Sequence, residues 1–309
     1  MPGFRSITVP AAADYPAVRG AVWYPCAEAP AAVDLGNVTK LFGITVTGAK
    51  DAPITGYMLP LVVVSHGRRS HLVMHHDLAE TLADGGFIVA AINHAGDNYF
   101  DQSRSAELSV MLQRPTEIKR LIDFMLTASP LAATIDRERI GVFGFSRGGH
   151  TGLALLGANP DWAGRADYLW KPSSEWQKQV RDAGFPRRDI AHDPRIRAGV
   201  IADPLAAFFT ESSFADVAAS IQLWASERGG DGVTLESVAA VGRCLPTRHE
   251  SHVVCNAGHF AFLIPCRPAL AKVVPEICID PPEFDRPVFH KRFNADVLAF
   301  FQAHLVGAR

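Results

Sequence analysis

A serine flanked by glycines stands where an apolar run of the sequence ends. Gly144, Ser146 and Gly148 form a G-x-S-x-G pattern that follows the apolar residues 140–143 and precedes a run of Ala, Leu and Gly. The order of strand, sharp turn and helix is that of a nucleophile elbow, which presents a serine hydroxyl at a helix N-terminus. The glycines let the backbone of such a turn pack closely. We therefore expect Ser146 to act as a nucleophile in acyl transfer.

A serine nucleophile needs a general base, and in this arrangement the base follows the serine in the chain. His259 is our candidate because it comes directly after Gly258, at a turn that follows the last expected strand. A histidine on such a loop can reach over the elbow. Three other histidines are weaker candidates: His249, His252 and His290.

The acid that orients the base is expected between the serine and the histidine. We favour Asp231, which lies in a glycine-rich loop after the seventh expected strand. Asp203, which ends the sixth strand, is the alternative, and Glu227 is a third candidate. The acidic residues that do not orient the base would close turns or cap helices.

An oxyanion hole requires two backbone N–H groups aimed at the same oxygen. The residue after the nucleophile, Arg147, is expected to supply one, and Arg68, in the turn after the third strand, the other. His66 and Arg69 of that turn are candidate substrate-binding residues. If the three arginine side chains meet at the pocket mouth, they predict a substrate that carries a carboxylate or phosphate. In the alternative interpretation they pair with acids, which include Asp97 and Asp101.

Histidines and aspartates also gather near the third and fourth strands. His71 and His75 are four residues apart and would share one face of a helix, as zinc ligands can. No third ligand completes a known pattern, although His76, His94, Asp77 and Asp97 lie nearby in the sequence. We expect packing or surface roles for these residues, and no metal.

Short apolar segments alternate with helical patterns along most of the chain. Eight strands are expected, at residues 4–9, 20–24, 61–65, 87–92, 140–143, 198–202, 221–225 and 252–255. Helices are expected at residues 71–84, 107–127, 146–156, 235–241 and 292–305. The alternation predicts an α/β fold, namely a doubly wound and mostly parallel eight-stranded sheet.

Two segments depart from this alternation. Residues 27–59 are rich in Ala, Pro and Gly and are interpreted as a long loop. Residues 159–195 carry several aromatic side chains among charges and are interpreted as a lid insertion, the alternative being a solvated helix pair. We expect residues 1–309 to form a single domain.

Composition limits the function classes. A net charge of −2 and 20% charged residues give no electrostatic basis for binding nucleic acid, and no run is long enough to span a membrane. A small-molecule partner is expected, with the chain a monomer or homodimer. The first residues lack the apolar core of a signal peptide, so a cytoplasmic location is expected. The odd number of cysteines, five, favours free thiols. If the protein were periplasmic or secreted after loss of a leader, Cys266 and Cys278 would be the pair to form a disulfide.

Four stretches together resemble a known family: residues 59–67, 86–94, 144–149 and 257–260. They are similar to the dienelactone-hydrolase-like branch of the α/β-hydrolase superfamily, near the platelet-activating-factor acetylhydrolases and bacterial polyester hydrolases. The resemblance covers about residues 20–305. It implies a serine esterase that acts on short acyl esters without a cofactor. In position Asp203 resembles the acid of the acetylhydrolases, whereas Asp231 resembles that of the dienelactone and polyester hydrolases. Dienelactone hydrolases use a cysteine nucleophile, so Ser146 argues against that particular activity.

These observations predict a serine hydrolase of carboxylic esters that works through an acyl-enzyme. An amidase or C–C bond hydrolase would use the same residues, and a non-catalytic binding protein with this fold is the alternative of a different class.

Overall fold

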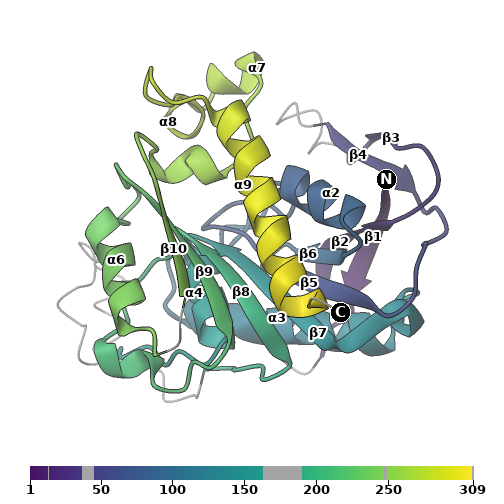
Figure 1. The fold of residues 1–309 in the computed structure, drawn as a ribbon, viewed down its shortest axis with the longest axis horizontal. Helices are drawn as coiled ribbons and strands as arrows, with labels where there is room; N and C mark the ends of the chain where they lie inside the picture. Colours follow the sequence, from purple (N-terminus) through teal and green to yellow (C-terminus); the bar gives the residue numbers. More distant parts are fainter. Residues whose placement is uncertain (13, 37–44, 163–189, 247–248, 308–309) are drawn as a thin grey trace.

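The computed structural model describes residues 1–309 except 13, 37–44, 163–189, 247–248 and 308–309. A ten-stranded sheet runs through the described part of the molecule (Figure 1). Its strands are β1 Pro2–Val9, β2 Val18–Pro25, β3 Ala31–Val33, β4 Val46–Lys50, β5 Leu59–Ser65, β6 Ile88–Ile92, β7 Ile135–Phe145, β8 Ile196–Ala202, β9 Ser220–Ser226 and β10 His249–Val254.

The strand order is β10-β9-β8-β7-β5-β6-β2-β1-β4-β3. The six strands from β10 to β6 run parallel, while β2 pairs antiparallel with both β6 and β1. From β5 the chain moves to one side to form β6 and then returns to β7 on the other side. Ligands of open α/β sheets bind at such a switch point, beyond the carboxyl ends of the strands. The β5–β7 junction is where the sequence places Ser146.

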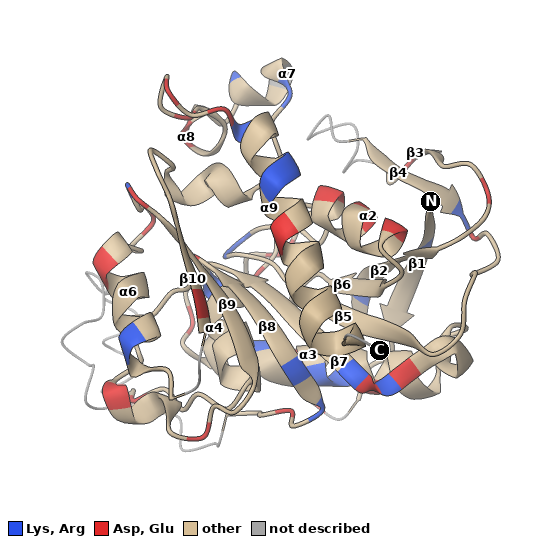
Figure 2. Ribbon diagram, in the orientation of Figure 1, with Lys and Arg blue, Asp and Glu red and all other residues tan. Residues whose placement is uncertain are grey.

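Helices cover both faces of the sheet. The longer ones are α2 His76–Asp84, α3 Ser109–Thr127, α4 Arg147–Leu155, α6 Leu235–Cys244 and α9 Arg286–Phe301. Figure 1 shows α9 crossing one face beside α2, with α3 and α4 behind the sheet. Charged residues of both signs are spread over the helices and loops, and few lie in the central strands (Figure 2).

Side chains of the central strands alternate between two apolar cores. In β5, Leu61 and Val63 belong to the core that includes residues of α3 and α4, whereas Val62 and Val64 belong to the core beneath α2 and α9. All four are at most 2% exposed. A strand buried on both faces reads as a continuous apolar run, and for this reason it could be recognised in the sequence.

The expected doubly wound fold is confirmed, but the sheet has ten strands rather than eight. The two additional strands, β3 and β4, lie within residues 27–59, which the sequence analysis interpreted as a loop. They form a short antiparallel hairpin whose second strand pairs with β1 at the sheet edge. Edge strands this short carry too little periodicity to be recognised. Most of the expected lid, residues 163–189, lies outside the described residues.

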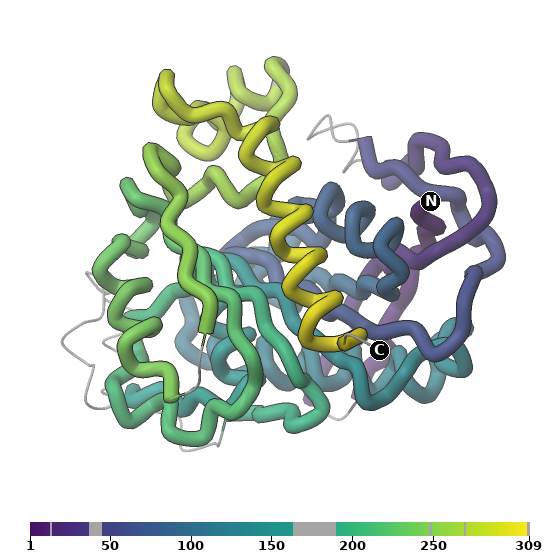
Figure 3. The backbone as a smooth tube through the Cα atoms, viewed as in Figure 1, coloured from purple at the N-terminus to yellow at the C-terminus, as the bar shows by residue number. Residues whose placement is uncertain are grey.

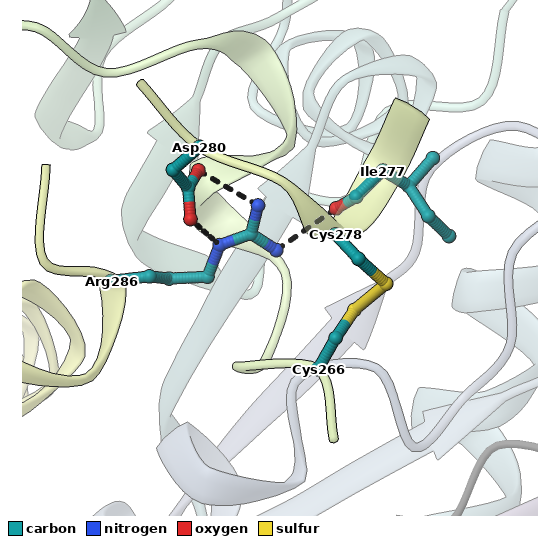
Figure 4. Close-up of a disulfide and its surroundings, with 5 residues drawn as sticks. All are labelled: Cys266, Ile277, Cys278, Asp280 and Arg286. Carbon is teal, nitrogen blue, oxygen red and sulfur yellow. Dashed lines mark hydrogen bonds and ion pairs between the residues drawn. A yellow bond between two sulfur atoms is a disulfide. The ribbon is translucent and has the colours of Figure 1, made fainter. Parts of the chain in front are cut away.

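The segment between His259 and α9 projects from the body of the molecule (Figure 3). It contains the short helices α7 Pro268–Ala271 and α8 Pro275–Cys278 and is closed by a disulfide between Cys266 and Cys278. Beside the disulfide, Arg286 makes two hydrogen bonds to the Asp280 carboxylate, of 2.7 and 2.8 Å (Figure 4). The preference for five free thiols was therefore wrong for this pair, while Cys26, Cys244 and Cys255 are free.

Candidate active site

Ser146 occupies the sharp turn between β7 and α4. Its backbone has φ 56° and ψ −118°, a conformation that L-residues rarely adopt and that occurs at functional sites. The turn packs so closely that a Cβ on Gly144 would lie 2.2 Å from the Gly148 carbonyl oxygen. A Cβ on Gly148 would lie 1.9 Å from the Ser65 carbonyl oxygen. Only glycine fits at both positions, as the motif predicted.

Ser146, His259 and Asp203 form a continuous chain of hydrogen bonds. His259 Nε2 lies 3.0 Å from Ser146 Oγ, and His259 Nδ1 lies 3.0 Å from Asp203 Oδ2. Since the carboxylate accepts the Nδ1 proton, Nε2 is left to accept the serine proton. All three residues are at most 6% exposed. The arrangement has the connectivity of a Ser-His-Asp triad.

Asp203 makes the contact with His259 that the sequence analysis had expected from Asp231, so the preference for Asp231 was wrong. Asp203 follows β8 directly, with a left-handed φ of 41° that turns its side chain toward the histidine. Its carboxylate accepts hydrogen bonds from the backbone N–H of Ser226, at 2.7 Å, and from the Ser226 hydroxyl.

The loop that carries Asp231 supports His259 through its backbone instead. Arg228 N donates to the Ala257 carbonyl at 3.0 Å, and His259 N donates to the Gly229 carbonyl at 2.8 Å. This pairing leaves Asp231 exposed at the surface. Glu227, the third candidate, accepts a hydrogen bond from Asn256 N at 2.6 Å.

An aromatic ring holds the imidazole of His259 from the side. The Phe145 ring is stacked on it, with centroids 4.7 Å apart and planes 30° apart. The other candidate histidines have different surroundings. His252 stacks on Trp224, and His290 lies 2.6 Å from Asp77 and 2.9 Å from the Ala261 carbonyl. His249 lies at the start of β10, at the opposite end of the strand from the His259 loop.

The loop after β5 lies against the nucleophile. A Cβ on Gly67 would come within 3.5 Å of Ser146 Cβ, which places the next residue, Arg68, beside the elbow. Arg147 is the first residue of α4, where the backbone N–H has no acceptor within the helix. The two expected oxyanion donors thus flank Ser146 from separate elements.

The three arginines have different surroundings. Arg147 is 4% exposed and donates to Asp97 Oδ2 at 2.8 Å and to the Ser105 carbonyl at 3.1 Å. Its side chain is therefore not at the pocket mouth, and the alternative of pairing with an acid holds for it. Arg69 is exposed, and its Nε donates to the Ser105 hydroxyl at 2.7 Å.

Arg68 is half-buried, and its guanidinium has no ion pair or hydrogen bond with any described residue. Its charge lies close enough to Arg147 to lower the pKa of that residue, after the larger effect of burial. The negative charge of Asp231 acts on Arg147 in the opposite direction. Arg68 and Asp231 therefore place opposite charges near the same buried arginine.

His66, expected to bind substrate, is 1% exposed and has a structural role instead. Its Nδ1 donates to the Gly67 carbonyl at 2.7 Å, and its Nε2 accepts from His94 N at 3.2 Å. Burial lowers the pKa of His66 well below its usual value, so the ring is neutral at pH 7. The ring links the loops that follow β5 and β6.

A second hydrogen-bonded series of serine, histidine and carboxylate begins at Ser65, the last residue of β5, and the sequence analysis did not recognise it. Ser65 Oγ is 2.9 Å from His94 Nε2, and His94 Nδ1 is 2.7 Å from Glu117 Oε2. None of these three side chains is exposed to solvent. No pattern in the sequence indicates these three hydrogen-bonded residues, because they come from β5, the loop after β6 and α3.

Neither a metal cluster nor a membrane helix is found in the described part of the chain. No group of three or more His, Cys, Asp or Glu side chains there is arranged to hold a metal ion. Within the same residues, no helix combines the length and apolar character needed to cross a membrane.

The sheet topology, the elbow and the hydrogen-bonded serine, histidine and aspartate define the class: the chain has the α/β-hydrolase fold. The structure is similar to that of a ferulic acid esterase from Streptomyces cinnamoneus, with a TM-score of 0.67 and 19% identity. The match covers 99% of this chain and 91% of that one. A candidate dipeptidyl aminopeptidase IV from Bacteroides ovatus matches with a TM-score of 0.57 and 13% identity, over 99% of this chain and 36% of that one.

No protein-family model matches the sequence. A platelet-activating factor acetylhydrolase from Canis lupus familiaris is 27% identical over an alignment of 168 residues, and the match covers 40% of this chain. The chain spans only 38% of the length of that relative. Together with the ferulic acid esterase structure, this similarity supports the expected resemblance to the esterase branch of the superfamily.

Proposed function

We propose that the protein is a serine hydrolase of carboxylic esters. The observation that carries the proposal is the hydrogen-bonded chain from Ser146 through His259 to Asp203, at 3.0 Å for each step. The similarity to an acetylhydrolase and to a ferulic acid esterase supports esters as the substrate class.

In the proposed reaction, Ser146 Oγ attacks the ester carbonyl while His259 Nε2 takes its proton. The carbonyl electron pair moves onto oxygen, and the N–H groups of Arg68 and Arg147 hold the resulting oxyanion. Collapse of this intermediate breaks the C–O ester bond, and His259 returns the proton to the leaving alkoxide. Water then attacks the acyl-serine by the same route, which releases the acid and regenerates Ser146.

The test is hydrolysis of p-nitrophenyl esters over a range of acyl lengths by the wild type and by Ser146→Ala. A fluorophosphonate probe, read by intact mass, reports the nucleophile independently of the substrate. We expect a single label on the wild type, and neither label nor turnover in the variant. Labelling without ester turnover would favour an amide or C–C substrate. No labelling and no turnover would refute the proposal and favour a non-catalytic binding protein.

We further propose that the ester carries an anionic group, which Arg68 meets. Two of the three arginines that motivated this idea are engaged with Asp97 or Ser105. Arg68 supports it because it follows Gly67, which packs against Ser146, and because its half-buried side chain has no partner among the described residues. A guanidinium in that position favours a carboxylate or phosphate near the scissile bond.

We also propose that the protein works in an oxidising compartment. The Cys266–Cys278 disulfide supports this location, because structural disulfides persist outside the reducing cytosol.

A further inference from the structure

We propose that Asp97 is a positioning residue that fixes the two backbone donors of the oxyanion hole relative to each other. The inference rests on the serine hydrolase function proposed above and concerns a residue that does not touch the substrate.

Asp97 contacts both segments that carry the expected oxyanion donors. Its Oδ1 accepts a hydrogen bond from the backbone N–H of Arg69 at 3.2 Å, one residue after Arg68. Its Oδ2 accepts from Arg147 Nη1 at 2.8 Å. One carboxylate thus joins the loop after β5 to the first residue of α4. These are the two elements that supply the expected N–H groups.

Arg114 reinforces the same junction from α3. Its Nη1 donates to Asp97 Oδ2 at 2.7 Å, and its Nη2 donates to the carbonyl oxygen of His66. Its Nε donates to Thr151 Oγ1 at 3.3 Å, and that hydroxyl donates to the Arg147 carbonyl at 3.0 Å. Arg114 therefore connects the loop after β5 to α4 through a second set of hydrogen bonds.

The cluster lies out of reach of solvent. Asp97 is fully buried, and Arg114 and Arg147 are 1% and 4% exposed. Burial lowers the pKa of Arg114 to about 10, so that it stays charged at neutral pH. Although burial opposes ionisation of Asp97, the two arginines hold its pKa below the usual value. A negative charge therefore lies between two positive charges at hydrogen-bond distance.

This charge arrangement is the reason that Asp97 controls the positions of the two N–H donors beside Ser146. Without the carboxylate, the two buried guanidiniums would keep their other hydrogen bonds but would face each other with no anion between them, and such groups move apart or admit water. Either response would shift Arg69 or Arg147 and, through the backbone, the N–H groups beside Ser146. Oxyanion donors stabilise the transition state only while they are held in place before the reaction.

The test compares Asp97→Asn with the wild type on one neutral p-nitrophenyl ester. Because complete loss of one oxyanion donor costs about 10²- to 10³-fold in kcat, we expect displacement to lower kcat by about 10- to 100-fold. KM should change little. The affinity of an alkyl boronic acid, whose serine adduct places an oxygen in the hole, should fall by a similar factor. The pH profile should keep its shape, because His259 and Asp203 are not displaced.

Asp193→Asn is the matched control. Asp193 is also buried and ion-paired, to Arg195 at 2.5 Å, but it lies at the amino end of β8, opposite the site. It should lose stability without losing kcat. If Asp97→Asn does not fold, Arg114→Lys carries the test, with a smaller loss of the same kind.

The inference is overturned if the folded Asp97 or Arg114 variant keeps wild-type kcat and boronic acid affinity, or if its loss appears in KM alone. It is also overturned if Asp193→Asn loses kcat equally. A wild type that neither turns over esters nor reacts with fluorophosphonate would instead refute the proposed function.

Discussion

Ser226 holds Asp203 through both of its hydrogen-bond donors. The serine is the last residue of β9, and its backbone N–H and its hydroxyl bond to the two different oxygens of the carboxylate. The acid thus comes from the end of β8, while the neighbouring strand supplies the groups that orient it. The third carboxylate contact, to His259, uses the oxygen that also accepts from the Ser226 hydroxyl.

Substituting each aspartate in turn should therefore show whether Asp203 or Asp231 is the acid that orients His259. Asp203→Asn places an amide beside His259 Nδ1 and favours the wrong imidazole tautomer, so we expect kcat to fall by about 10³-fold or more. Asp231→Asn removes an exposed charge and should leave kcat near the wild-type value. Steady-state kinetics on a neutral ester measures both variants. The assignment of Asp203 fails if Asp231→Asn is the inactive variant.

Arg68 should determine the preference for anionic over neutral esters, and it should have little effect on the rate with neutral esters. A half-exposed ion pair contributes up to about 1 kcal/mol, so Arg68→Ala should lose about fivefold in kcat/KM on a carboxylate-bearing ester. Its activity on the neutral ester of equal acyl length should persist. The wild-type preference should weaken as salt is added.

Arg69→Ala is the matched control for this measurement, since that side chain is exposed and bound to Ser105. Equal behaviour of the two variants, or a wild type without preference for the anionic ester, would contradict the proposed role of Arg68.

Glu117 should make stability depend on pH in an unusual direction for a carboxyl group. Burial raises its pKa from 4.5 to about 7, although Gln113, Arg114, Ala95 N–H and Arg120 oppose the shift. His94, which lies 2.7 Å from Glu117, is neutral because burial lowers the pKa of His94 well below the usual value. The folded protein therefore holds a proton on Glu117 that the unfolded chain releases at lower pH.

The stability that this proton supplies is complete below the unfolded-state pKa and is lost as the pH rises toward 7. Between about pH 5 and about pH 7.5, Glu117 should lower the free energy of unfolding by about 2 kcal/mol. Urea denaturation at both pH values should show this decline in the wild type and not in Glu117→Gln. The exposed Glu138 is the control, and Glu138→Gln should keep the decline. The same decline in Glu117→Gln would contradict the prediction.

The Cys266–Cys278 disulfide should stabilise the segment that follows His259. The two residues are 12 positions apart, and closing a loop of that size stabilises the folded state by about 3 kcal/mol. Denaturation with and without reductant should reveal this difference in the wild type. Cys278→Ser should be insensitive to reductant, whereas Cys244→Ser, at a free cysteine, should behave as the wild type does. Equal stability of the oxidised and reduced wild type would contradict the prediction.

The features that were predicted correctly from the sequence are each determined by residues that lie close together in the chain. The buried strand, the two glycines and Ser146 lie within nine residues, and each glycine is required by a backbone contact inside that turn or with β5. His259 was also recognisable, because a glycine turn marks the end of the last strand. The central strands were visible as unbroken apolar runs because both of their faces are buried.

The features that the sequence did not predict depend on side chains from distant segments. Nothing near Asp203 in the chain indicates that Ser226 would orient it, and the usual position after the next strand favoured Asp231. Likewise, Arg147 lies fifty residues from Asp97, its partner. An arginine beside an active-site serine looks available for substrate until the structure shows which carboxylate it contacts.

The closed loop between Cys266 and Cys278 also affects how the protein would respond to a protease. Lys272 and Val273 are exposed inside it, and Figure 4 shows the covalent bridge that joins its two ends. A trypsin cut after Lys272 would leave two polypeptides still linked through sulfur. The nicked protein would run as an intact chain on a non-reducing gel, and α9 would stay tethered to the rest of the fold.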